Sequence, residues 1–381
     1  MRGCITKKGS TYSIIVDLGR DKNGKRKQKW FNGFKTKKEA EKELAKVINQ
    51  IDNKTFVNPD KVTLKEYLTR WFDDIVEPNL SQTTKDGYRY FVDGHIVPAL
   101  GDILIQNLQP MHIQQFYKEQ LENGRVDGKG GLSAKSVLNI HRILKRALAH
   151  AVKMQVVNRN AAEFVEVPKQ KKYKASVLDE TQVQNMLKVF KETNLYIPVL
   201  LAVGLGLRRG EALGLRWQDI DFESNSIAII QTLLMTKGGI IFHDPKTETS
   251  KRVLIAPSTI MEELKKHKER QEEVIKIMGK AYQDNDLVSC YDDGHPFNPS
   301  TYSGLFGDIL KRNKLPQIRF HDLRHTNATI MLKHNISAKV ASERLGHSTI
   351  GITLDLYSHV LKEMQVEAAN KIEKAIFIDE K

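Results

Sequence analysis

One histidine and one arginine have the spacing that phosphoryl-transfer chemistry requires. They belong to the run His321-Asp322-Leu323-Arg324-His325. On a helix, positions i and i+3 lie on the same side, so His321 and Arg324 can reach one group together. A fixed cation can hold the non-bridging oxygens of a phosphate while an imidazole passes protons. The alternatives are an ordinary surface helix, or a metal site at His321 and His325 that lacks the glutamate of a His-Glu-x-x-His helix.

A second segment can aim another arginine at a phosphate. The glycine-rich run 204–217 places Arg208 directly before a predicted helix. A guanidinium held there can bind a phosphate through two parallel hydrogen bonds. Arg208 could equally pair with Glu211 on its own helix, so this segment alone indicates little.

Two more patterns follow toward the C-terminus. Leu345-Gly346-His347 places a histidine after a glycine, and Tyr357 stands between leucine and serine in a mostly apolar stretch. Taken singly, a histidine after a glycine is typical of a turn, and a tyrosine among leucines is typical of a core. Only the combination of the four patterns predicts a single site.

Together these patterns resemble those of the tyrosine recombinase family, which includes the integrases of phages and conjugative elements. That family is marked by Gly-Leu-Arg with a following Glu, by His-x-x-Arg, by Leu-Gly-His and by a tyrosine shortly after it. In this chain the corresponding residues occur in the same order: Gly206-Leu207-Arg208 with Glu211, His321 with Arg324, Leu345-Gly346-His347, and Tyr357.

The resemblance implies a site-specific recombinase that cuts and rejoins DNA through a covalent 3′-phosphotyrosine intermediate, and so integrates and excises a mobile element. It implies no cofactor, metal or ATP. Arg208 and Arg324 would clamp the scissile phosphate, and His321 would assist proton transfer. His347 would donate a hydrogen bond to a non-bridging oxygen, and Tyr357 would attack the phosphorus.

The family also uses a lysine on a β-hairpin as the general acid for the leaving 5′-oxygen. Residues 245–253, Pro-Lys-Thr-Glu-Thr-Ser-Lys-Arg-Val, resemble that hairpin. Lys246 is therefore the candidate general acid, with Lys251 and Lys237 as alternatives. Glu211 resembles the supporting acidic residue of the family, which orients the arginine and does not react.

Two positions depart from the family pattern. Asn327 stands where an aromatic residue is more common, and Asn335 stands where a glycine usually follows the helix. Asparagine tolerates the left-handed conformation, so Asn335 is a reasonable substitute. Neither position is a presumed catalytic residue, so we expect an active enzyme.

The N-terminal segment predicts a separate DNA-binding module. Residues 1–56 carry 15 Lys and Arg against 6 Asp and Glu, within a formal net charge of +14 for all 381 residues. Residues 11–34 are β-rich around an Asn-Gly turn, and Thr36 precedes a helical apolar pattern. This small α+β module, a three-stranded sheet with one helix, resembles the arm-type DNA-binding domain of integrases. The alternative is a basic face that is only solvated. If the module binds DNA, its candidate contacts are Lys25, Arg26, Lys27 and Lys29.

Residues 61–167 predict an all-α core-binding domain. Thr63 begins a capping box ahead of an amphipathic helix, and further helices are expected from Ser81, over Pro110–Glu122 and from Ser133. Cations on the last of these either follow DNA phosphates or face water: Arg142, Lys145 and Arg146.

A basic, proline-containing linker at 167–174 precedes the catalytic domain, residues 174–381. We expect this domain to be mainly α-helical with a small antiparallel sheet within 226–256.

The basic composition favours a polyanionic partner, and no apolar run is long enough to span a membrane. Cys4 and Cys290 are too few for a disulfide framework, which favours free thiols in a reducing cytoplasm. The family resemblance implies a bacterial cell, with the protein associated with the nucleoid. The expected partner is double-stranded DNA with core-type and arm-type attachment sites. The resemblance implies a homotetramer on the synapse, with a host bending factor and an excisionase as further candidates.

Three other functions remain possible from the residues alone. Topoisomerase-like nicking and closing uses the same chemistry but needs no basic N-terminal module. A DNA-binding regulator that kept the fold would not need the complete set of motif residues, and a metal-dependent nuclease would need magnesium ligands. The tail after Tyr357 is apolar enough to dock on a neighbouring subunit or on its own domain.

Overall fold

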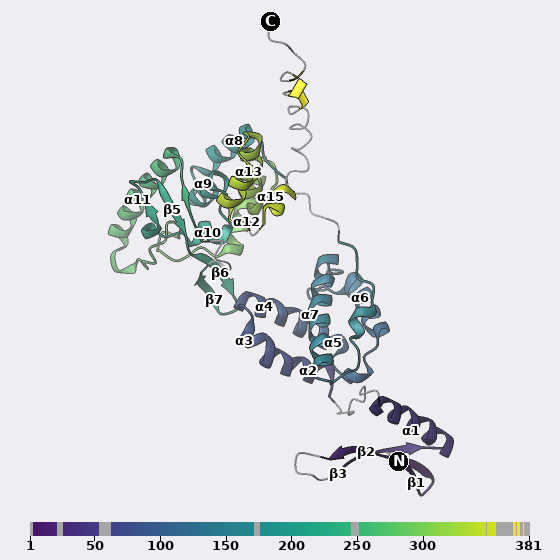
Figure 1. Ribbon diagram of the computed structural model, residues 1–381. Coiled ribbons are helices and arrows are strands. Elements are labelled where there is room, and N and C mark those ends of the chain that lie inside the picture. The colour runs from purple at the N-terminus through teal and green to yellow at the C-terminus, as the bar shows by residue number, and fades with distance from the viewer. Residues whose placement is uncertain are drawn as a thin grey trace. The chain divides into compact units, whose positions relative to one another are not determined.

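The computed structural model describes residues 3–20, 26–52, 62–170, 176–244, 251–347, 349–355, 369–370, 372–373 and 376 (Figure 1). The chain divides into two compact units, Met1–Lys171 and Lys172–Lys381. Within the described ranges, no helix combines the length and the apolar character needed to cross a bilayer.

The N-terminal part of the first unit is a three-stranded antiparallel sheet with one helix. The strands β1 (Gly3–Lys8), β2 (Thr11–Arg20) and β3 (Arg26–Phe34) lie in that order, and α1 (Lys37–Asp52) packs on the sheet. Its small core centres on Ile14, Val16, Ala40 and Val47. The predicted α+β module is confirmed, although its first strand precedes the segment 11–34. The Asn-Gly turn lies outside the described residues.

The rest of the first unit is helical, as predicted. Thr63 closes a capping box, because its Oγ1 accepts from the Glu66 amide at 3.2 Å and the Glu66 carboxylate accepts from the Thr63 amide at 2.9 Å. Two π-helical turns, η1 and η2, interrupt the helices and were not anticipated. The helical elements are α2 (Leu64–Trp71), η1 (Phe72–Val76), α3 (Glu77–Asn79), α4 (Gln82–Phe91), η2 (Val92–Ile96), α5 (Val97–Leu100), η3 (Ile105–Asn107), α6 (Pro110–Asn123), α7 (Ala134–Lys153) and η4 (Ala161–Phe164).

The second unit is mainly helical with two small antiparallel sheets, β4-β5-β8 and β6-β7. This confirms the predicted fold class. Its elements are α8 (Glu180–Phe190), α9 (Tyr196–Leu205), α10 (Arg209–Gly214), η5 (Trp217–Asp219), β4 (Ile220–Asp221), β5 (Ser226–Ile229), β6 (Thr232–Thr236), β7 (Gly239–His243), β8 (Arg252–Ile255), α11 (Ser258–Met278), η7 (Gly279–Ala281), α12 (Pro299–Arg312), α13 (Phe320–Lys333), α14 (Ala338–Leu345) and α15 (Ile350–Asp355).

Helix α9 packs against α13 (Figure 1). This packing brings the end of α9 close to a motif residue of α13, since Arg324 donates to the Gly206 carbonyl at 2.7 Å. Helix α9 is buried along most of its length and ends at Gly206, whose φ of +71° suits a glycine. Asn327 of α13 donates from Nδ2 to the carbonyls of Val203 and Gly204 at 2.9 and 3.1 Å. These bonds satisfy carbonyls at the end of α9. They give a structural reason for asparagine at the position where an aromatic residue is more common.

Asn335, the second departure, adopts the left-handed conformation expected for it, with φ of +60°.

Candidate active site

Arg208 is held by two acceptors from different parts of the second unit. It precedes α10 in extended conformation, and its Nη1 donates to Glu211 Oε1 at 2.6 Å. Its Nη2 donates to the Gly346 carbonyl at 2.6 Å, and its amide donates to Glu211 Oε2 at 2.9 Å. The Glu211 side chain is 2% exposed, whereas that of Arg208 is 34% exposed. Pairing with Glu211 therefore fixes Arg208 and still leaves part of its side chain exposed to a ligand.

Arg324 on α13 is a buried cation with an unused donor. The residue is 2% exposed, and its Nη1 donates to the Gly206 carbonyl at 2.7 Å. Its Nη2 is buried and has no hydrogen-bond partner among the described residues. Burial, followed by the charge of Arg208, lowers the pKa of Arg324 to about 9. A buried donor without a partner is costly, and an anion bound beside it would supply the missing acceptor.

His347 follows the turn that Arg208 contacts. Its Nδ1 lies 2.8 Å from Oγ1 of the buried Thr353 on α15. Burial, followed by the charges of Arg324 and Arg208, lowers the pKa of His347 to about 3, so the ring is neutral at pH 7. When the Thr353 hydroxyl donates to Nδ1, the ring proton lies on Nε2, the tautomer that can donate to a phosphate oxygen.

His321 lies at the start of α13 beside His325, with ring centroids 4.9 Å apart. Desolvation by the surrounding side chains, followed by the charges of His325 and Arg324, lowers the pKa of His321 to about 4, although the residue remains exposed. His321 also contributes to the lowered pKa of His347, as do Arg208 and Arg324. The structure thus brings four of the predicted site residues into one cluster: Arg208, His321, Arg324 and His347.

Two predicted catalytic residues, Lys246 and Tyr357, lie outside the described residues. The alternatives to Lys246 are described. Lys251 pairs with Asp244 at 3.1 Å, and Lys237 lies in the turn between β6 and β7. Lys237 therefore lies on the hairpin formed by β6 and β7, whereas the end of the segment 245–253, which was predicted to be a hairpin, enters β8, and β8 pairs with β5.

Arg252 and Thr353 were not singled out from the sequence. Arg252 Nη2 donates to Glu211 Oε2 at 2.9 Å, across 41 positions of the chain. Residues 245–253, which include the candidate general acid Lys246, also contain Arg252. A second cation close to a candidate general acid is a signal that could have identified it. Thr353 carries no sequence signal that separates it from other helical threonines.

The candidate DNA contacts are exposed or partly exposed where the structure describes them. Arg142, Lys145 and Arg146 are exposed on α7, and Arg146 donates to the Tyr88 hydroxyl at 3.2 Å. Arg26 is exposed and pairs with Asp17 at 2.7 Å, and Lys29 is partly exposed. Lys25 and the side chain of Lys27 lie outside the described residues.

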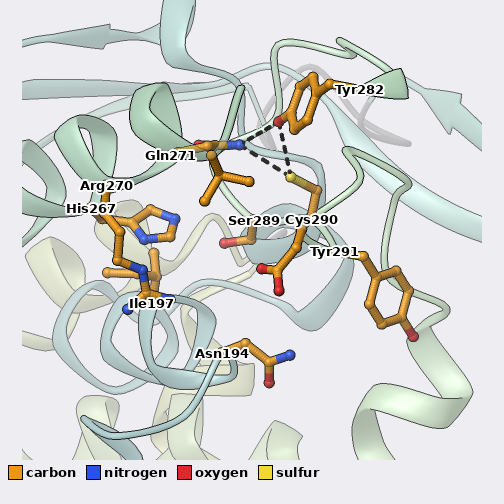
Figure 2. Close-up of a pocket in the computed structure, with 11 residues that line it drawn as sticks. Asn194, Ile197, His267, Arg270, Gln271, Tyr282, Ser289, Cys290 and Tyr291 are labelled. Carbon is orange, nitrogen blue, oxygen red and sulfur yellow. Dashed lines mark hydrogen bonds between the residues drawn. The ribbon is translucent and has the colours of Figure 1, made fainter. Parts of the chain in front are cut away.

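A pocket bordered by α11 and residues 282–292 includes none of the clustered residues (Figure 2). On its edge Gln271 Nε2 donates to the Tyr282 hydroxyl at 2.8 Å and to Cys290 Sγ at 3.1 Å, which the dashed lines show. Cys4 and Cys290 are both free thiols. Within the described ranges, no group of three or more His, Cys, Asp and Glu side chains could hold a metal ion.

Three family models match successive parts of the chain. They describe an arm DNA-binding domain over residues 4–51, the N-terminal SAM-like domain of phage integrases over 63–121, and the phage integrase family over 176–364. The "Tyrosine recombinase XerC-like" protein of Caldanaerobacter subterraneus subsp. tengcongensis is 31% identical, with 95% of each chain covered. The chain belongs to the tyrosine recombinase family. The predicted family is therefore confirmed, as is the predicted enzyme class, a tyrosine-type site-specific recombinase.

Other relatives and solved structures agree with this assignment. The ICEBs1 integrase of Bacillus subtilis strain 168 is 27% identical over 78% of each chain. The Tn1549 transposon integrase, solved with transposon right-end DNA, has a TM-score of 0.68 at 21% identity, covering 83% of this chain and 100% of that one. A lambda integrase dimer bound to a core site has a TM-score of 0.54 at 20% identity, covering 77% and 95%. At these identities the two structures show a shared fold.

Proposed function

We propose that this recombinase cuts and rejoins double-stranded DNA through a covalent 3′-phosphotyrosine on Tyr357, and so integrates and excises a mobile element. The observation that carries the proposal is the buried guanidinium of Arg324, whose Nη2 lacks a partner among the described residues, beside the partly open Arg208. Two cations that repel each other are stabilised by an anion held between them, and a DNA phosphodiester is such an anion.

In the proposed reaction the Tyr357 oxygen attacks phosphorus and its proton leaves toward His321. The P–O5′ bond breaks, and Lys246 donates the proton that the 5′-oxygen needs. A tyrosine with its ordinary pKa near 10 attacks poorly, so the arginines must lower the cost of the developing charge. Neutral His347 donates from Nε2 to a non-bridging oxygen. The 3′-phosphotyrosine keeps the phosphodiester's energy, so a 5′-hydroxyl can reseal the strand and release Tyr357.

The direct test of this chemistry is cleavage without metal. The protein is incubated with a nicked core site in EDTA, so that the cut fragment diffuses away and the intermediate accumulates. We expect a covalent protein–DNA adduct that survives denaturation. Cleavage that disappears in EDTA would favour a metal-dependent nuclease instead.

The domain organisation is also a proposal: 1–56 binds arm-type DNA, 61–167 binds core-type DNA, and 174–381 performs catalysis. The three family matches support it, because each falls within one of these ranges. Arg26 and Lys29, together with Lys25 and Lys27, are the proposed arm contacts. Arg142, Lys145 and Arg146 are the proposed core contacts, because their exposed side chains share one helix.

Deletion of residues 1–56 is expected to spare cleavage of the core site and to weaken binding of arm-type DNA. The deleted segment carries 15 Lys and Arg against 6 Asp and Glu, and neutralised phosphates release counterions. Arm binding by the full chain should therefore fall steeply as salt rises, whereas the truncated chain should show little arm binding at any salt concentration. Gel-shift titrations over a salt series measure this. Loss of covalent cleavage in the deletion variant would contradict the modular arrangement.

Recombination joins two duplexes, so we propose two protomers per core site and four per synapse. A host bending factor and an excisionase would choose between integration and excision. We propose that the enzyme acts at the nucleoid of a bacterial cell, in the cytoplasm, because its proposed substrate is DNA.

A further inference from the structure

The side chain of Arg252 connects three segments of the candidate active site. It is 7% exposed and stands at the start of β8, directly after residues 245–251, which contain Lys246. Its Nη2 and Nη1 donate to the two carboxylate oxygens of Glu211 at 2.9 and 3.3 Å. Its Nε donates to the carbonyl of Arg344 at 2.7 Å. All three guanidinium nitrogens therefore donate either to Glu211, which is a motif residue, or to Arg344, which precedes the motif Leu345-Gly346-His347.

The Glu211 carboxylate is shared between two arginines. Oε1 accepts from Arg208 Nη1 at 2.6 Å, while Arg252 binds the same carboxylate through its two terminal nitrogens. A carboxylate that is 2% exposed needs such partners, because an unpaired buried charge is strongly unfavourable. Arg252 thus stabilises the Glu211 carboxylate, which in turn fixes Arg208.

The other end of the Arg252 side chain supports the turn before His347. Gly346 ends α14 with a φ of +64°, and a Cβ at that position would lie 3.2 Å from Cδ and Nη1 of Arg252. Arg252 binds the carbonyl of Arg344, and Arg208 binds the carbonyl of Gly346. Both arginines therefore fix the same turn, from which His347 projects.

We infer that Arg252 is a positioning residue of the recombination reaction. Acting through Glu211 and the turn at 344–346, it fixes the positions of Arg208 and His347, which would bind the phosphate. It also connects both residues to β8, the strand that follows the segment containing Lys246. This inference rests on the proposed function and extends it to a residue outside the recognised motifs.

The first test compares Arg252→Gln and Arg252→Lys with a matched control, Arg216→Gln. Arg216 also makes a two-bond ion pair, with Asp219 at 2.8 and 2.9 Å, and contacts none of the clustered residues through it. The rate of covalent adduct formation is measured in a single turnover on a nicked core site, alongside core-DNA affinity and melting temperature. We expect Arg252→Gln to slow adduct formation by about a hundredfold, the size typical of lost active-site positioning, with affinity changed less than about threefold.

Arg252→Lys keeps the charge but not the planar fork, so we expect a smaller loss of about tenfold. The Lys variant also provides the test if the Gln variant fails to fold. Arg216→Gln should stay within about twofold of the wild type, a change too small to reflect a lost catalytic interaction.

The second test uses pH and a double variant, which a purely structural role would not affect. Burial alone would raise the pKa of Glu211, but Arg252 and Arg208 lower it to about 2, and Arg324 faces the same carboxylate from α13. Removing Arg252 raises the pKa of Glu211, so Glu211 becomes protonated at a higher pH in the variant than in the wild type. The ratio of wild-type to Arg252→Gln cleavage rates should therefore grow as pH falls from about 8 to about 5, toward the ordinary range of a carboxyl.

In a Glu211→Gln background the Arg252→Gln change should cost less than about threefold and lose this pH dependence, because the two residues act as one unit. Two results would overturn the inference: additive losses in the double variant, or rates of Arg252→Gln and Arg252→Lys within twofold of the wild type. In either case, adduct formation by the wild type would still uphold the proposed function. A wild type that forms no adduct would instead defeat the proposed function and this inference with it.

Discussion

Arg324→Ala is expected to reduce the rate of covalent adduct formation by about a thousandfold, or about 4 kcal/mol of transition-state stabilisation. Arg324 is almost fully buried, is held by the Gly206 carbonyl, and has a second terminal nitrogen without a partner among the described residues. Charge developing on the non-bridging oxygens would meet this buried donor. The measurement is single-turnover cleavage of a nicked core site.

Stability distinguishes this prediction from simple unfolding. Burial and Arg208 lower the pKa of Arg324, so the folded protein disfavours its charge, and removing the cation relieves that cost. The space left by the buried side chain and the loss of its bond to the Gly206 carbonyl oppose this gain, so the melting temperature is measured for each variant and cleavage rates are compared between folded proteins. Arg312→Ala, at an exposed position of α12, is the control and should cleave at the wild-type rate. Near-normal cleavage by a folded Arg324→Ala protein would contradict the assignment of Arg324 to the phosphate.

Tyr357→Phe is expected to bind core DNA with wild-type affinity and to form no adduct. The substitution removes only the hydroxyl oxygen that becomes bonded to phosphorus, so the loss should be complete rather than partial. Gel shifts measure binding, and denaturing gels measure the adduct. Tyr291→Phe is the matched control, because Tyr291 lines the pocket of Figure 2 and lies outside the clustered residues. A normal adduct from Tyr357→Phe would mean that another residue is the nucleophile.

Local sequence signals predicted much of the fold because their causes are local. Thr63 with Glu66, and the left-handed Asn335, depend on a few neighbouring residues, and the structure places them as expected. The π-helical turns at Phe72–Val76 and Val92–Ile96 were not predicted, because the same apolar stripe suits an uninterrupted helix. The pairing of β8 with β5 also escaped prediction, since strand partners depend on contacts between distant segments.

The same distinction applies to the candidate site. The motifs identified Arg208, His321, Arg324 and His347, because residue type and order alone carry the family resemblance. They did not include Arg252 or indicate its partner, because Arg252 reaches Glu211 across 41 positions of the chain. Asn327 looked like a minor departure until its side chain was found to bind the carbonyls that end α9. Partners that are close only in three dimensions could not be found from spacing.

The central claim is a 3′-phosphotyrosine on Tyr357, and mapping the covalent adduct tests it most directly. Wild-type protein is trapped on a nicked core site in EDTA, digested with protease and nuclease, and analysed by mass spectrometry. The account predicts a nucleotide attached through its 3′-phosphate to the peptide containing Tyr357, together with a free 5′-hydroxyl on the released strand. A nucleotide on any other residue, or attachment through a 5′-phosphate, would contradict it.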